Sequence, residues 1–280
     1  MRLGAARFVA GETLDQCVEV LRRLNAAGLV TNTTLLGEGV KDAVAAAAIG
    51  ETYLGVLDRI AAEGLRTNLA VKLTHLGLDA GEDVACSNVA RLVARAAELG
   101  NFIRIDMEES ARVDATLRIY RRLRSDGFDN VGTVLQSYLY RSEEDLRSLL
   151  PLRPNLRIVK GAYLEPPEVA YPGKADVDRN FIRLAEIMLT DGGYTAVATH
   201  DERIIVHVME FTQRKGIGRD RFEFQMLYGV RPGTQLDLVR QGYRVLVATP
   251  YGADWYPYLM RRLAERPANV LFVVRNLFRR

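Results

Sequence analysis

The chain has 280 residues, 48% of them hydrophobic and 26% charged, a balance typical of globular proteins and not of disordered or fibrous ones. The net charge of +3 is small and the basic residues are spread along the chain, so we expect no nucleic-acid partner. No apolar stretch approaches the roughly 18 residues of a membrane span, and the first residues lack the apolar core of a secretory signal. Cys17 and Cys86 are not in a CxxC spacing, which favours reduced thiols in a cytoplasmic protein.

Helical periodicity begins with a short N-terminal helix, expected at about 12–27. Thr13 and Gln16 have the spacing of a capping box, and Gly28 follows as a helix stop. Further helices are expected at about 39–63, 83–99, 109–125, 142–150, 176–191, 201–214, 232–241 and 254–265.

Short apolar runs of strand length lie between these helices. They are Leu29–Leu36, Thr67–Leu73, Phe102–Met107, Val131–Gln136, Leu156–Lys160, Thr195–Thr199, Phe222–Leu227 and Arg244–Thr249. Strands that alternate with helices indicate parallel βαβ units, and eight such units in about 250 residues predict a closed (β/α)8 barrel. We expect a single domain over residues 1–280. A doubly wound open sheet is the alternative, but no GxGxxG follows the first strand to support a nucleotide site there.

Polar residues follow or end each predicted strand. They are Glu38, Lys72 with His75, Asp106 with Glu108, Gln136, Lys160 with Tyr163, Thr199 with His200 and Asp201, Gln225, and Tyr251. The C-terminal strand ends of a barrel meet at one mouth, where active sites lie. Any one of these residues is explained more simply by the start of a loop. All eight strand ends together predict a functional mouth.

Several chemistries fit such a mouth. Only five of the 38 basic residues are lysine, and Lys72 or Lys160 could form a Schiff base or hold a carboxylate or phosphate. A metal site is disfavoured, because no histidine has an HxH or HExxH spacing. His207 lies within a predicted helix and is interpreted as a packing residue.

The last predicted helix carries Tyr258, Arg261, Arg262 and Glu265 at i, i+3, i+4 and i+7, and therefore on one face. Two arginines beside an aromatic ring are well suited to hold a carboxylate. A solvated, charged surface helix is the simpler alternative for this pattern alone.

The strand-end motifs, taken in order, resemble the proline dehydrogenase family over nearly the whole chain. They are Leu35-Leu-Gly-Glu38, Val71-Lys-Leu73, Ile105-Asp-Met-Glu-Glu109, Leu135-Gln-Ser-Tyr138, Arg157-Ile-Val-Lys-Gly-Ala-Tyr163, Ala198-Thr-His-Asp201, Phe222-Glu-Phe-Gln-Met-Leu227, Tyr251, and Tyr258-Leu-Met-Arg-Arg262. The resemblance implies oxidation of L-proline to Δ1-pyrroline-5-carboxylate by hydride transfer to FAD.

The resemblance also implies the roles of individual residues. Asp106 and Arg157 match active-site positions. Residues that match flavin contacts are Met107, Gln136, Arg157, Lys160, Gly161, Ala162, Thr199, His200 and Gln225. Residues that match proline contacts are Lys72, Tyr251, Tyr258, Arg261 and Arg262. The last helix would lie over the barrel mouth, and Glu38 would pair with Arg261 as a gate.

The physical chemistry agrees with these roles. The cofactor supplies the hydride chemistry, while the paired arginines and Lys72 orient the substrate carboxylate. Arg157 would stabilise negative charge as the flavin is reduced. We expect Asp106 to orient a neighbouring cation, with Lys72 as its partner. No general base for the substrate amine stands out.

Two other functions remain open from the residues alone: a Schiff-base aldolase that uses Lys72 or Lys160, and a non-catalytic flavin-binding barrel. Hydroxyproline is an alternative substrate, although Tyr258 would crowd its hydroxyl. The resemblance implies a membrane quinone as electron acceptor, reached by transient peripheral contact with the inner membrane. We expect a monofunctional enzyme.

Overall fold

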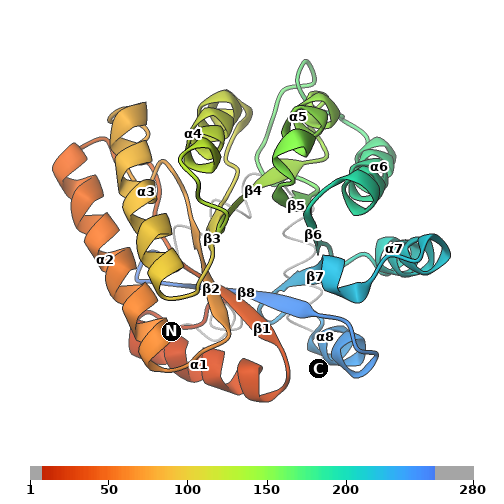
Figure 1. Cartoon of the computed structure of the whole chain (residues 1–280), viewed down its shortest axis with the longest axis horizontal. Helices are drawn as coiled ribbons and strands as arrows, with labels where there is room; N and C mark the ends of the chain where they lie inside the picture. Colours follow the sequence, from red (N-terminus) through yellow and green to blue (C-terminus); the bar gives the residue numbers. More distant parts are fainter. Residues whose placement is uncertain (1–7, 256–280) are drawn as a thin grey trace.

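The computed structural model describes residues 8–255, and within them eight parallel strands close into a barrel in chain order (Figure 1). The strands are β1 Val30–Leu35, β2 Thr67–Val71, β3 Ile103–Ile105, β4 Val131–Gln136, β5 Asn155–Val159, β6 Tyr194–Ala198, β7 Phe222–Leu227 and β8 Val245–Tyr251. The barrel closes where β1 pairs with β8 over the register Val30↔Leu246 to Leu35↔Tyr251.

Helices surround the barrel on the outside (Figure 1). They are α1 Leu14–Ala26, α2 Ala43–Ala62, α3 Glu82–Glu98, α4 Val113–Ser125, α5 Ser142–Leu149, α6 Lys174–Asp191, α7 Glu202–Lys215 and α8 Pro232–Arg240. Short 3-10 turns precede three elements, as η2 Ser110–Arg112, η3 Leu150–Leu152 and η4 Arg219–Arg221. In the part of the chain from residue 8 to residue 255, no helix combines the length and the apolarity needed to cross a membrane.

The predicted (β/α)8 barrel is confirmed, and the alternative of an open sheet is wrong. Strand β3, Ile103–Ile105, is shorter than its apolar run Phe102–Met107 at both ends. Helix α4 begins four residues later than predicted, after the turn η2. The last predicted helix, 254–265, lies almost wholly outside the described residues, as do parts of the single domain expected over 1–280.

Only one of the two hydrogen bonds of the predicted capping box forms at the N-terminus of α1. The side chain of Thr13 accepts a hydrogen bond from the backbone N–H of Gln16 at 3.4 Å. The Gln16 side chain accepts from the backbone N–H of Glu12, at 2.8 Å, instead of from Thr13 as a capping box requires. The reciprocal bond is therefore displaced by one residue.

The barrel interior is polar where most barrels are filled by branched apolar side chains. Asn32, Arg104, Arg157, Glu223 and Gln225 are all buried. Burial of charged and polar groups is costly unless they are paired. Four of these side chains form one hydrogen-bonded network, whereas Arg104 donates to Asn155 and to the Thr133 carbonyl. The apolar core instead fills the layer between strands and helices, with Phe181, Leu184 and Val208 among its buried members.

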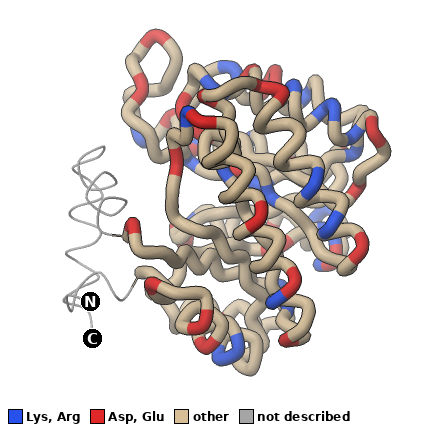
Figure 2. The backbone as a smooth tube through the Cα atoms, turned by 90° about the vertical axis from the view of Figure 1, so that its left-hand side faces the viewer, with Lys and Arg blue, Asp and Glu red and all other residues tan. Residues whose placement is uncertain are grey.

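Charges of both signs are interspersed over the helices, as the small net charge leads one to expect (Figure 2). Ion pairs link neighbouring helices, such as Arg95 with Asp58 at 2.8 Å and Arg118 with Glu82 at 2.7 Å. Exposed pairs of this kind contribute little individually to stability. They do not point to a macromolecular partner.

Candidate active site at the barrel mouth

The parallel strands bring the predicted site residues to one end of the barrel. Lys72 follows β2 and Asp106 follows β3, with a backbone bond from Asp106 N–H to the Val71 carbonyl at 2.9 Å. Arg157 in β5 and Gln225 in β7 point into the barrel, since their side chains meet across it. Asp106, Arg157 and Gln225 therefore form one polar cluster that reaches from the mouth into the barrel.

Arg157 is the centre of this cluster. Its guanidinium donates from Nη1 to Asp106 Oδ1 at 2.6 Å, from Nε to Gln225 Oε1 at 2.5 Å, and from Nη2 to Asn32 Oδ1 at 3.3 Å. The partners come from β1, β7 and the end of β3, so the plane of the guanidinium is fixed from three directions. A single carboxylate balances its charge, and the cation is held ready to act on a group above it.

Glu223 fixes the amide of Gln225. The amide Nε2 donates to Glu223 Oε1 at 2.6 Å, which turns the amide oxygen toward Arg157. The other oxygen, Glu223 Oε2, accepts from Arg244 Nε at 2.8 Å and from the Tyr194 hydroxyl at 3.2 Å. The sequence interpretation missed Glu223 and Asn32. The alternation of side chains along a strand could have identified them. Glu223 lies two residues before Gln225 and shares the inward face of β7, and Asn32 is a polar residue inside a largely buried strand.

Lys72 pairs with Glu38 and not with Asp106, so the predicted partner was wrong. Glu38 follows β1, the strand next to β2, and reaches the lysine directly. Asp106 is instead taken by the longer, planar side chain of Arg157 from across the barrel. The proposed gate between Glu38 and Arg261 remains a prediction, because Arg261 lies outside the described residues.

Of the other residues predicted to bind proline, the structure describes Tyr251 but not Tyr258 or Arg262. Tyr251 ends β8 and is buried, with only 3% of its surface exposed. Its position at the mouth agrees with a role in covering the substrate. Tyr258 and Arg262 lie outside the described residues, so the expected carboxylate clamp and the helix that carries it stay predictions.

Lys160 is held by two carboxylates, Asp178 Oδ1 of α6 at 2.6 Å and Asp201 Oδ2 at 3.2 Å. Asp201 also caps α7 by accepting from the Arg203 N–H. Burial alone would raise the pKa of Asp201, but hydrogen bonds from Arg203 and Lys160 outweigh it and hold the pKa well below its usual range. Schiff-base chemistry needs a free, neutral amine, whereas Lys160 and Lys72 are both engaged by carboxylates.

His200 is a neutral hydrogen-bonding group. Its Nε2 accepts from the backbone N–H of Leu227 at 2.9 Å, which leaves the ring proton on Nδ1. Burial, with the positive charges of Arg231 and Lys160, lowers the pKa of His200 to about 4. The ring therefore stays neutral at physiological pH, with its proton on Nδ1.

The other two histidines differ from each other. The His75 ring is buried with Nδ1 3.1 Å from the Tyr53 hydroxyl, and burial lowers its pKa to about 4. His207 was interpreted as a packing residue, and this is wrong in part. Its Nε2 lies 2.7 Å from Glu186 Oε1 on the partly exposed face between α6 and α7, although its ring also stacks near Phe211.

The donors at the mouth suit a flavin. Gln136 donates from Nε2 to the Glu108 carbonyl at 2.8 Å, and burial raises the pKa of the Glu108 carboxyl. Thr199 accepts from the Asp201 N–H at 3.1 Å, and Met107 is buried nearby in the chain after β3. Two amides, a guanidinium, a neutral imidazole and a lysine match a ring rich in nitrogen and oxygen and a phosphorylated tail.

Gly161 shapes the turn that follows Lys160. Its φ of +112° is a conformation that side chains rarely adopt, and a Cβ there would lie 2.2 Å from the Tyr138 ring. Only glycine fits, so the backbone of Gly161 passes close over Tyr138. Gly161 and Ala162 are partly exposed at the mouth. Both were predicted to contact the cofactor.

Comparison with known proteins gives a single family. The family model described as proline dehydrogenase matches residues 17–275. Proline dehydrogenase of Deinococcus radiodurans is 47% identical over 279 residues, covering 98% of this chain and 90% of the relative. Proline dehydrogenase 1 of Bacillus subtilis (strain 168) is 43% identical, covering 100% of this chain and 92% of the relative.

Solved structures agree with the sequence relatives. Proline utilization A (PutA) from Bdellovibrio bacteriovorus, inactivated by N-propargylglycine, superposes with a TM-score of 0.87 at 25% identity over 93% of this chain. The present chain spans only 32% of that PutA protein. The fold, the order of the mouth residues and these relatives lead to one conclusion. The chain belongs to the proline dehydrogenase family.

Proposed function

We propose that the chain oxidises L-proline to Δ1-pyrroline-5-carboxylate and that FAD is the hydride acceptor. The observation that carries the proposal is the meeting of Lys72, Asp106 and Arg157 at one barrel mouth, each at the position of a family motif. FAD, when bound, supplies the redox chemistry, and the protein supplies position and electric field.

The residues that would hold FAD surround Arg157. They are Met107, Gln136, Arg157, Lys160, Gly161, Ala162, Thr199, His200 and Gln225. Arg157 is fixed by three partners, so its positive charge needs no reorganisation when negative charge develops nearby during hydride transfer. Lys160 keeps a cationic group near the expected position of the tail.

The substrate would lie between the flavin and the last helix. Lys72 attracts the proline carboxylate, Tyr251 covers the ring, and Tyr258, Arg261 and Arg262 complete the clamp. An anchored carboxylate sets the distance and angle of the ring carbon whose hydride leaves, which is how binding energy is converted into rate.

Glu38 is proposed to act as a gate with Arg261 while it also pairs with Lys72. Replacement of Glu38 by Ala should raise the KM for proline more than it lowers kcat, because closure over bound substrate is lost. Steady-state kinetics with proline test this. An unchanged KM contradicts the gate, and a lower KM would show that Glu38 instead competes with the substrate carboxylate for Lys72.

The electron acceptor proposed for the reduced enzyme is a membrane quinone. A cytoplasmic enzyme would reach it by transient, peripheral contact with the inner membrane. Proline-dependent reduction of a soluble quinone analogue, followed with and without lipid vesicles, tests this. If proline is oxidised as fast with oxygen as the only acceptor, a quinone is not the electron acceptor.

The proposed activity is tested by cofactor extraction together with turnover. Heat-released cofactor should co-elute with FAD and not with FMN, and proline should reduce a dye acceptor with a higher kcat/KM than hydroxyproline. The aldolase alternative predicts no flavin and covalent trapping by borohydride in the presence of substrate.

A further inference from the structure

A second cavity lies at the opposite end of the barrel from the mouth. It has a volume of about 600 Å³ and is lined by residues that precede β4 to β7 or begin those strands. Asn155 and Tyr194 are the first residues of β5 and β6. The N-terminal strand ends therefore form its floor, and it shares no lining residue with the predicted active site.

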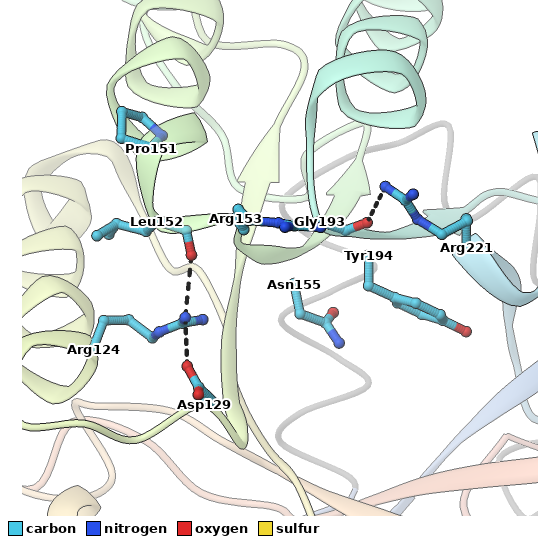
Figure 3. Close-up of a pocket in the computed structure, with 9 residues that line it drawn as sticks. All are labelled: Arg124, Asp129, Pro151, Leu152, Arg153, Asn155, Gly193, Tyr194 and Arg221. Atoms are coloured by element: carbon cyan, nitrogen blue, oxygen red, sulfur yellow. Dashed lines mark hydrogen bonds and ion pairs between the residues drawn. The ribbon is translucent and has the colours of Figure 1, made fainter.

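Arginine dominates the lining. Arg124, Arg153 and Arg221 face the cavity with one acidic residue, Asp129, which gives the lining a net charge of +2. Figure 3 shows Arg124 and Asp129 on one side, Tyr194 and Arg221 on the other, and Asn155 between them. Asp129 forms an ion pair with Arg124 at 2.7 Å, so the net positive charge of the lining rests on Arg153 and Arg221.

Hydrogen bonds to backbone carbonyls hold two of the three arginines, Arg124 and Arg221. Arg124 donates to the Leu152 carbonyl at 3.1 Å, and Arg221 donates to the Gly192 and Gly193 carbonyls at 3.0 and 3.2 Å. Arg153 is exposed, and its side chain forms no hydrogen bond or ion pair with any residue between 8 and 255. A guanidinium with five donors and no partner is suited to receive an oxyanion.

The backbone at Arg153 has a conformation that favours glycine. Its φ of 45° and ψ of 60° are left-handed, a conformation in which glycine is less strained than any residue with a Cβ. Gly193 closes on it so tightly that an added Cβ would lie 2.3 Å from the Arg153 carbonyl oxygen. Replacement of Arg153 by glycine would therefore remove the guanidinium without adding backbone strain.

We propose that this cavity binds a small organic dianion that carries carboxylate or phosphate groups, separately from the site at the mouth. A volume of about 600 Å³ is large for a single inorganic ion but is in the range of small-molecule sites. Leu152 and the Tyr194 ring offer apolar contact for the organic part, while the arginines receive the charged ends.

The test uses the full chain and titration calorimetry with phenyl phosphate and with glutarate at constant ionic strength, with chloride as the reference anion. At least one of the two probes should bind the unaltered protein. Tighter binding of phenyl phosphate assigns a phosphate ester, and tighter binding of glutarate assigns a dicarboxylate. Arg153→Gly should weaken binding about tenfold or more, because it removes the guanidinium while relieving the backbone.

Arg231→Gly is the matched control, since Arg231 also has a left-handed backbone, with φ 49°, but lies outside the cavity. It should bind both probes unchanged. Should Arg153→Gly fold poorly, Arg153→Asn tests the same loss in a residue that tolerates this backbone. No binding beyond chloride, equal loss in both glycine variants, or retention in Arg153→Gly would overturn the proposal.

Glutarate could also bind at the mouth. Binding that is lost in Lys72→Ala but kept in Arg153→Gly would place the probe there and refute the second site. The Arg153 variants leave the residues at the mouth unaltered, so the failure of either proposal leaves the other measurable.

Discussion

At the scale of single residues, the active-site arginine is held by a chain of side chains and not by one partner. Arg157 meets the Gln225 oxygen at 2.5 Å only because the Gln225 amide donates to Glu223 at 2.6 Å. An amide can turn over, and a carboxylate beside its NH2 group removes that freedom. Glu223 therefore positions Arg157 through Gln225, without contact with substrate.

Glu223→Gln should lower kcat about tenfold, because a glutamine at 223 can face the Gln225 amide in either orientation. The KM for proline should change less than kcat, and the reduction potential of the flavin should shift, which loss of structure alone would not produce. Glu186→Gln on the outer face of α6 is the control. Unchanged kcat and potential would contradict the positioning role.

Residue types at the mouth could be predicted from the sequence, but their pairings could not. Lys72 and Asp106 follow strands, whereas Arg157 and Gln225 lie within strands, and the strand periodicity together with the family motifs identifies all four. The pairing of each cation with a carboxylate depends on how far its side chain extends across the closed barrel. Asp106 is thus taken by Arg157 from β5, while Lys72 turns to Glu38 after the adjacent β1.

At the scale of elements, the turn between β5 and α6 positions the backbone expected to contact FAD. Gly161 allows this turn to pass over Tyr138. The positions of strands and helices followed from apolar periodicity, since long periodic segments leave few alternatives. Loop geometry did not, because the close contact of residues 138 and 161 joins segments from two strands.

Gly161→Ala should lower the free energy of unfolding by about 2 kcal/mol or more, through backbone strain and the clash with Tyr138. FAD affinity should fall with it. Gly100→Ala is the control, because Gly100 also has a positive φ, +61°, but a Cβ there meets nothing within 4 Å. Thermal unfolding of both variants is the measurement. An equal effect in the two would show that packing against Tyr138 plays no part.

At the scale of the whole molecule, the two ends of the barrel carry different charge arrangements. The mouth pairs its lysines and Arg157 with carboxylates, whereas the opposite cavity leaves Arg153 unpaired within residues 8–255. His75, which is buried, and His200, which is partly buried, also link stability to pH. The pKa values of His75 and His200 are both lowered to about 4.

A histidine whose folded pKa is depressed stabilises the fold less as pH falls, because the unfolded chain takes up protons first. From a reference of 6.5 to about 4, His75 and His200 should each remove about 2 kcal/mol of stability between pH 7 and pH 5. Glu108 acts in the opposite direction, since burial raises its pKa, while Asp201 matters only below pH 3.8.

Urea unfolding at several pH values measures this dependence. His200→Asn should flatten the decline between pH 7 and pH 5. Stability that stays constant over this range in the unaltered protein would contradict the neutral state of both rings.

The most direct test of proline oxidation is the absorbance spectrum of the purified protein before and after anaerobic addition of L-proline. Bound oxidised flavin should absorb near roughly 450 nm, and the band should bleach when proline is added. A flavin band that proline leaves unchanged, or a colourless protein that stays inactive after addition of FAD, would contradict the assignment.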